Sequence, residues 1–254
     1  MSKSWNERGI RELKKKNTKY YLIGIIILAV AIIGLFMYMP ISKKRHAAEE
    51  LKQKYHEEFK IISYSGIKLS QDYYTVEAYS VEYPNLIFRA SIDNKSGDIM
   101  DSYVTKRLCS RISDKISQNL KTLKDDYYVF TEAMLEDTLL TDPTISIEEY
   151  LKEETSNIFT IYLCIDQNGS SAQNIVTSVN NMLNGLPEFS GSVEIFLTDT
   201  NLLARIKEYV ESNSDTYFEF DEMTEDTYIG TISFENGHVA LTEYTLNKMI
   251  TEEK

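Results

Sequence analysis

The run IFTIYLCI at Ile158–Ile165 constrains the fold more than any other stretch of this 254-residue chain. Apart from the hydroxyl of Tyr162, Thr160 is its only polar side chain. A near-continuous apolar run of this length is typical of a strand covered on both faces, whereas a strand with one solvated face alternates apolar and polar residues. We therefore predict a central strand of a sheet here.

Helices and strands alternate after this run. The turn sequence DQNGS at Asp166–Ser170 precedes one predicted helix, and Asp199 precedes another. Their apolar faces carry Ile175, Val176, Val179, Met182 and Leu183 in the first helix, and Leu202, Leu203, Ile206 and Val210 in the second. Further strands are predicted at Ser192–Leu197, Tyr217–Phe220 and Tyr228–Phe234, and a turn at Glu235–Gly237 leads into a last helix. Residues 157–254 thus form a predicted β-α-β-α-β-β-α module.

A smaller β-β-β-α module is predicted upstream, over residues 59–124. Its strands, rich in Tyr, Val, Ile and Phe, are Lys60–Tyr64, Tyr73–Val81 and Leu86–Ile92. After a turn at Asp93–Asp98, apolar residues mark one face of a helix: Val104, Leu108, Ile112, Ile116, Leu120 and Leu123. Residues 125–156 form a less regular bridge, in which SIEE at Ser146–Glu149 is a capping box. The predicted fold class is α+β, with two small modules.

A transmembrane helix is predicted at Tyr20–Met39, YYLIGIIILAVAIIGLFMYM, which has no charged or amide side chain. A helix of twenty residues spans about 30 Å, the thickness of the hydrocarbon core of a bilayer. We expect Pro40 to end it. No cleavage site of the A-x-A kind follows, which favours an uncleaved anchor over a signal peptide.

The basic residues around this segment predict its orientation. Seven precede it and five follow it closely: Lys3, Arg8, Arg11, Lys14, Lys15, Lys16 and Lys19, then Lys43, Lys44, Arg45, Lys52 and Lys54. Because the more basic flank stays inside, residues 1–19 are predicted to be a cytoplasmic tail and the C-terminal part to be extracellular.

Residues 40–58 have helix-forming composition and predict a helical stalk beyond the membrane. Ala47, Leu51, Tyr55 and Phe59 recur at four-residue spacing and form a thin apolar stripe. Such a stripe is open to self-association with another copy, although it is too short for a coiled-coil signature.

Charge is divided unevenly along the chain. Residues 1–46 carry 10 basic and 2 acidic side chains, whereas residues 47–254 carry 17 basic and 37 acidic ones, a net charge of −20. A field of that sign repels phosphates, so we expect no nucleic-acid partner.

Residues that would assemble a catalytic or metal site are scarce. His46, His56 and His238 accompany no GxSxG motif, and Cys109 and Cys164 cannot supply a zinc site alone. No EF-hand or phosphate-loop pattern occurs, so we expect no metal, no cofactor and no catalytic residue. For the two cysteines, buried free thiols are favoured over one disulfide.

Tyrosine is abundant, with 18 residues, and Tyr73, Tyr79 and Tyr83 are predicted on one face of the second strand. Tyrosine-rich surfaces bind partners, which makes these three the candidate partner-binding residues. The alternative is cross-strand packing within the sheet.

Three short stretches resemble a module of uncharacterised Gram-positive envelope proteins and lipoproteins, over residues of about 55–104. They are Tyr55–Phe59, Phe88–Asp93 and Asp101–Tyr103. The resemblance implies a Gram-positive cell surface and free cysteines, and it brings no catalytic residues.

These features predict a membrane-anchored interaction or accessory protein of a bacterial cell envelope: an adaptor, a secretion or conjugation accessory, or an immunity-type binder. It would be no enzyme and would meet a protein partner at the outer membrane face. The alternative is an extracellular hydrolase that uses carboxylates on cell-wall material.

Overall fold

The computed structural model describes residues 25–30, 38–65, 72–120, 127–134, 138, 140–153, 158–166, 172–184, 191–213, 220, 223–224, 226–234 and 248, with residues 172, 178 and 182–184 as backbone only. The chain divides into two compact units, Met1–His46 and Ala47–Lys254. The second unit is mixed α+β with two four-stranded sheets, which confirms the predicted α+β class.

In the first unit, residues 25–30 and 38–46 are helical. The expectation that Pro40 ends helical structure is therefore wrong. Proline fits the first turn of a helix, where its missing N–H has no intrahelical partner, so it is as compatible with a start as with an end. Most of the predicted transmembrane segment (20–24 and 31–37) lies outside the described residues. Among those that are described, no helix is long and apolar enough to span a bilayer.

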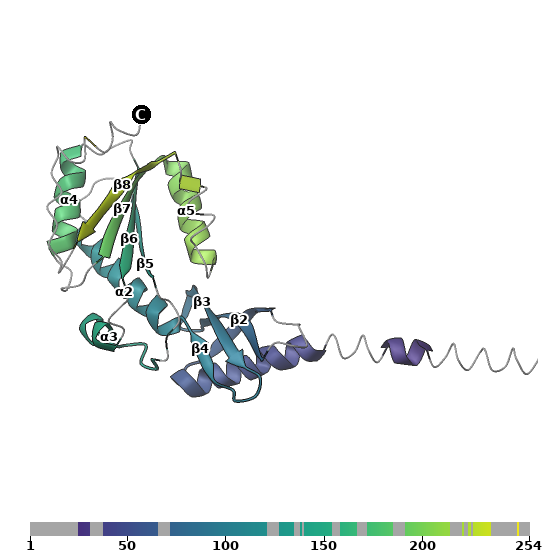
Figure 1. The fold of residues 1–254 in the computed structure, drawn as a ribbon. Helices are drawn as coiled ribbons and strands as arrows, with labels where there is room; N and C mark the ends of the chain where they lie inside the picture. Colours follow the sequence, from purple (N-terminus) through teal and green to yellow (C-terminus); the bar gives the residue numbers. More distant parts are fainter. Residues whose placement is uncertain are drawn as a thin grey trace, which may run out of the picture. The chain divides into compact units, whose positions relative to one another are not determined.

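The first sheet is an antiparallel meander in the order β1-β2-β3-β4 (Figure 1). Its strands are β1 (Phe59–Ser65), β2 (Tyr73–Ser80), β3 (Tyr83–Asp93) and β4 (Ile99–Asp101). The first three match predicted strands, and the predicted turn after β3 contains Gly97 at a φ of 79°. β4 was missed because three residues are too few to show a period of two.

One face of this sheet packs against the helical residues 47–55, and the side chains of Ala47, Leu51 and Tyr55 are buried there. The apolar stripe predicted for a stalk is therefore part of the hydrophobic core of its own chain. His56, with a φ of 59°, ends the helix, and its N–H donates to the carbonyl of Lys52 at 2.8 Å.

The second sheet has the order β5-β6-β7-β8, with β6 and β7 parallel and the other pairs antiparallel. Its strands are β5 (Tyr127–Ala133), β6 (Phe159–Asp166), β7 (Gly191–Thr198) and β8 (Tyr228–Phe234). The central position predicted for β6 is confirmed. β5 was not predicted. It lies in the expected bridge, and the partner strand that stabilises it comes about thirty residues later, so its own sequence carries little of the signal.

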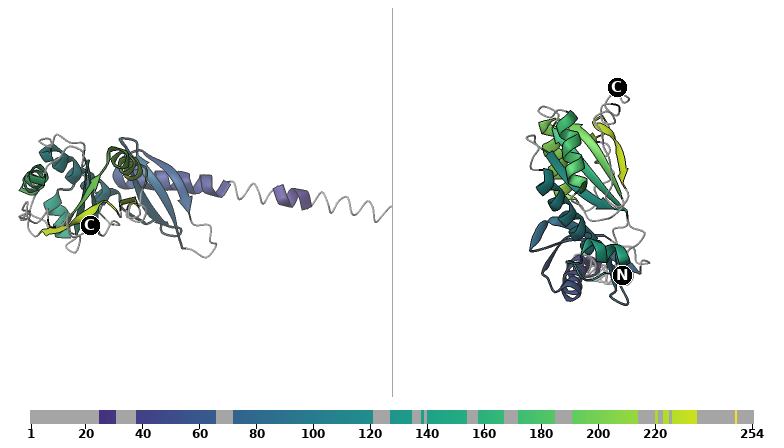
Figure 2. Two further views of the ribbon diagram at one scale, coloured as in Figure 1. Left: turned by 90° about the horizontal axis from the view of Figure 1, so that it is seen from above. Right: turned by 90° about the vertical axis from the view of Figure 1, so that its left-hand side faces the viewer.

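Helices α4 (Ala172–Asn184) and α5 (Thr200–Ser212) flank the second sheet on opposite faces (Figures 1 and 2). Residues of β6 alternate between them. Ile161, Leu163 and Ile165 belong to the core that includes α4, whereas Tyr162 and Cys164 belong to the one that includes α5. The helix predicted after Asp199 is confirmed, and Asp199 caps it by accepting from the N–H of Leu202 at 2.8 Å.

Helix α2 (Tyr103–Asn119) connects the two sheets. Its predicted apolar face is buried at Val104, Leu108, Ile112 and Ile116. At its start the ring of Tyr103 packs against Tyr55, Phe59 and Phe88 of the first sheet's core, and further along the helix packs on β5. The two predicted modules thus share one hydrophobic core.

Helix α3 (Ile147–Glu153) begins at the predicted capping box: the N–H of Glu149 donates to Ser146 Oγ at 3.1 Å, and the N–H of Ser146 donates to Glu149 Oε2 at 3.3 Å. Cys109 and Cys164 are both free and buried, as predicted. The predicted last helix lies outside the described residues except for Lys248, and so does the predicted strand at 217–220 except for Phe220, which is helical.

Candidate binding groove

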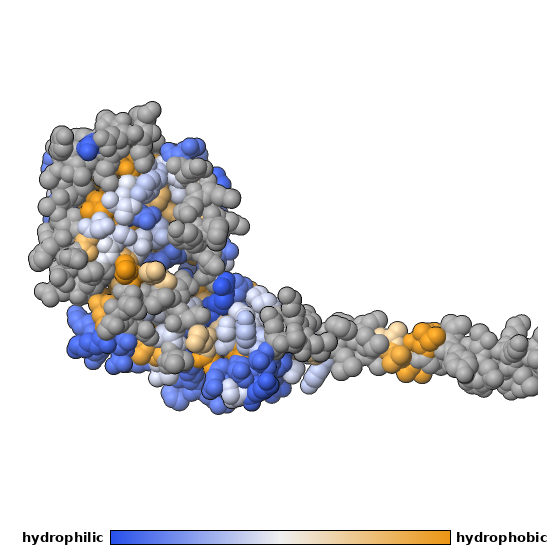
Figure 3. Space-filling model, viewed as in Figure 1, coloured by the Kyte–Doolittle hydropathy of each residue, from blue (hydrophilic) through white to orange (hydrophobic). Residues whose placement is uncertain are grey.

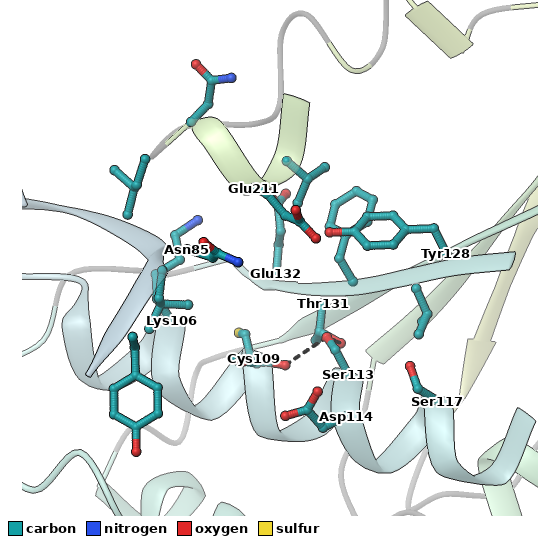
Figure 4. Close-up of a pocket in the computed structure, with 18 of the residues that line it drawn as sticks. Asn85, Lys106, Cys109, Ser113, Asp114, Ser117, Tyr128, Thr131, Glu132 and Glu211 are labelled. Atoms are coloured by element: carbon teal, nitrogen blue, oxygen red, sulfur yellow. Dashed lines mark hydrogen bonds between the residues drawn. The ribbon is translucent and has the colours of Figure 1, made fainter. Parts of the chain in front are cut away.

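A groove of about 510 Å³ runs along the outer edge of β5. Four elements line it: the first residues of β3, one side of α2, β5 and the C-terminal end of α5. Figure 4 shows Lys106, Cys109, Ser113, Asp114 and Ser117 along α2, with Glu132 and Tyr128 on β5 and Glu211 on α5. Its volume falls within the range of about 300–1,000 Å³ typical of ligand-binding clefts.

The wall formed by α2 is polar and is held in place by hydrogen bonds to β5. Ser113 Oγ donates to the carbonyl of Cys109 at 2.9 Å and lies 3.1 Å from Thr131 Oγ1. Nearer the end of the helix, Tyr127 Oη donates to the carbonyl of Ser117 at 2.9 Å. These bonds fix the distance between the helix and the strand, so the groove keeps its shape.

The outer edge of β5 directs backbone N–H and C=O groups towards the groove. The N–H of Met134 donates to the carbonyl of Ile158 at 2.8 Å. Met134 and every second residue before it therefore point their backbone N–H and C=O groups towards β6. In an antiparallel pair the residues between them point their N–H and C=O away from the partner strand. Val129 and Thr131 are such residues. Each is 6% exposed, and their outward backbone groups have no partner within the described part of the chain.

The opposite wall is a large bulge in β3. Ala78 of β2 pairs with Phe88, but the next pair is Ser80 with Tyr83, so residues 84–87 of β3 have no registered partner in β2. These four residues, Pro84, Asn85, Leu86 and Ile87, all line the groove. Bulges are common beside functional sites because they redirect side chains and end the pairing of a strand.

The groove is acidic. Glu82, Asp114, Glu132 and Glu211 line it, against one lining cation, Lys106. Burial raises the pKa of the Tyr128 hydroxyl, and the nearby carboxylate of Glu211 raises it further, so this tyrosine stays neutral and able to donate a hydrogen bond. A positively charged ligand is the complement of such a surface.

The structure separates the three tyrosines that the sequence grouped together. Tyr73 and Tyr79 lie on the open face of β2, opposite the buried Tyr74, Val76 and Ala78. Tyr83 is instead the first residue of β3 and lines the groove, where the Arg107 guanidinium carbon lies 3.2 Å from its ring centroid. That all three bind a partner stays a prediction.

Sequence reasoning missed the rest of the groove. Its acids are spread over α2, β5, α5 and the turn before β3, so no local motif marks them, and the bulge in β3 depends on how β2 pairs. The β-rich composition of Tyr127–Phe130 was the available signal for β5. Among the described residues, no group of three or more histidine, cysteine or acidic side chains could hold a metal ion.

Comparison with known proteins shows the fold but no function. No family model matches the chain, and no curated protein matches it. A crystal structure of a DUF5037 family protein from Ruminococcus gnavus ATCC 29149 is similar, with a TM-score of 0.59 and 14% sequence identity. The match covers 81% of this chain and 98% of that one. At this identity the likeness establishes a shared α+β fold alone.

Proposed function

We propose that this protein is a membrane-anchored interaction protein whose globular unit, Ala47–Lys254, binds another polypeptide in the β5 groove. The observation that carries the proposal is the outer edge of β5, where Val129 and Thr131 are nearly buried and their outward backbone groups have no partner among the described residues. Buried backbone N–H and C=O groups are almost always paired in folded proteins, so an edge of this kind favours a site that a partner completes.

The anchor is the second part of the proposal. Ile25, Ile26, Ile27, Leu28 and Val30 belong to a described helical segment and are 55% to 66% exposed, and Figure 3 shows this segment as a hydrophobic stretch. Exposed apolar stretches of this kind mark surfaces that contact a membrane or another protein. Together with the uncharged sequence of residues 20–39, they support a membrane span with the globular unit on the extracellular side.

Site-specific photo-crosslinking in cells tests the groove. A benzophenone amino acid at Asn85, which is exposed and lines the groove, is expected to form an adduct with a defined protein, identified by mass spectrometry. Ser110→Trp, on the groove side of α2, should abolish that adduct because the indole fills the cleft. Lys115→Trp is the matched control, since Lys115 is exposed on the same helix outside the groove.

The crosslinker at Tyr73 distinguishes the two candidate surfaces. An adduct at Tyr73 that survives Ser110→Trp, with none at Asn85, would move the binding surface to the open face of β2 and overturn the groove assignment.

A further inference from the structure

The outer edge of β5 indicates which type of ligand the groove binds. Within the described residues, Val129 and Thr131 direct backbone donors and acceptors out of the second sheet. Small molecules pair poorly with such a row, whose natural complement is another extended backbone at the strand spacing of about 4.8 Å.

Helices contact β5 on both sides of this edge. Helix α2 contacts β5, and so does α5, while side chains of α2, α5 and the bulge of β3 line the space beside the edge. The core residues of β5 divide in the same way, with Val129 in the cluster that includes α2 and Phe130 in the one that includes α5. A fifth strand would therefore be covered by helices on both faces, as β6 is.

The negative charge of the groove lining favours extended segments that carry cationic side chains. Four carboxylates, Glu82, Asp114, Glu132 and Glu211, line the groove, against one lysine, Lys106. Side chains of an added strand alternate between its two faces, so cationic side chains at alternate positions would meet the carboxylates of one wall of the groove.

We infer that the groove binds an extended, lysine- or arginine-bearing segment of another protein, which adds to the free edge of β5 as a fifth strand. This inference rests on the proposed function and specifies its ligand. Backbone pairing supplies affinity, and the acidic lining supplies the preference for a basic segment.

The probe is a fluorescein-labelled heptapeptide, KVKVKVK, titrated against the full-length chain in detergent micelles and followed by fluorescence anisotropy. Saturable binding is expected for KVKVKVK and none for EVEVEVE. Methylation of every backbone nitrogen of the peptide should weaken binding roughly tenfold or more, because several backbone hydrogen bonds of about 0.5–1.5 kcal/mol each are lost. Equal affinity of the methylated peptide would overturn strand addition.

Variants of the protein test the charge. Glu211→Gln should weaken binding of KVKVKVK and reduce its salt dependence. Glu208→Gln is the matched control on α5, since Glu208 is exposed and lies outside the lining. An equal effect of the two substitutions would show that only the general negative charge of the unit attracts the peptide.

Amide hydrogen exchange tests the location. Exchange at Val129 and Thr131 should slow when KVKVKVK binds, and protection confined to other strands would refute the assignment to β5. These amides could instead be protected before the peptide is added and lose that protection when residues 1–19 are deleted. That result would show that the basic tail of this chain, and not another protein, binds the edge of β5. A groove-dependent crosslink at Asn85 without KVKVKVK binding would retain the proposed function and reject the basic strand.

Discussion

The ammonium of Lys54 lies 2.8 Å from Oδ2 of Asp101, and this ion pair joins the 47–55 helix to the end of β4 in the interior of the globular unit. The Asp101 side chain is 0% exposed and that of Lys54 is 12% exposed. Asp101 also accepts from Tyr55 Oη at 2.8 Å and from the N–H of Tyr103 at 2.9 Å. One buried carboxylate therefore positions a helix, a short strand and the start of α2.

Loss of this ion pair should destabilise the protein strongly. Removing one partner of a buried pair leaves an uncompensated charge, so Lys54→Met is expected to lower the free energy of unfolding by about 3–5 kcal/mol. The Lys52–Glu58 pair is exposed at both ends, so Lys52→Met should cost under about 1 kcal/mol. Urea unfolding followed by circular dichroism measures both, and equal losses would contradict a special role for Asp101.

The 47–55 helix should be indispensable to the globular unit. Residues 47–254 expressed alone should be soluble and should unfold cooperatively, because they form one compact unit. A chain that begins at residue 59 lacks Leu51, Tyr55 and the cation that pairs with Asp101, and it should aggregate or fail to show a cooperative transition. Cooperative folding of the shorter chain would show that the helix is a dispensable stalk.

Stability should fall in alkali. Burial raises the pKa of Tyr74 to about 12 and of the Cys164 thiol to about 12, from ordinary values of 10.0 and 9.0, and it also raises the pKa of Tyr55. The folded state therefore holds these protons more tightly than the unfolded state. The resulting stability is fully present below about pH 9 and is lost progressively as the pH rises towards 12. Urea midpoints across this range, with tyrosinate absorbance, check it. Full ionisation of the tyrosines in a still-folded protein would be inconsistent with their burial.

Neither cysteine should react in the native state. Cys109 is 3% exposed and Cys164 is 0% exposed, and the raised pKa of Cys164 removes its thiolate at neutral pH. Ellman's reagent should therefore release almost no chromophore until urea unfolds the protein, after which both thiols should titrate. One thiol or none in the unfolded, unreduced protein would reveal a modification or a disulfide.

The orientation of the anchor gives the fifth prediction. Protease added to intact cells should degrade the chain beyond Lys43 and spare a tag placed before residue 20. A protected globular unit with a degraded tag would reverse the orientation, and degradation of both would exclude a sealed span.

The local pattern of apolar side chains determined the elements that bury one clear face or a continuous run. Helix α2 was predictable because Val104, Leu108, Ile112 and Ile116 repeat at the helical spacing, and strand β6 because its apolar run is nearly continuous. The same holds for local chemistry. The capping box at Ser146–Glu149 and the cap at Asp199 form between residues three apart, so no distant contact is needed.

Tertiary structure alone decided the role of the 47–55 helix and the existence of the groove. An apolar stripe on a helix shows that it packs on something, but only the fold shows that Leu51 meets the first sheet of the same chain rather than a second copy. The edge position of β5 and the bulge at residues 84–87 are set by which strands pair and in what register. Register depends on contacts between residues far apart in sequence, which is information that no single segment contains.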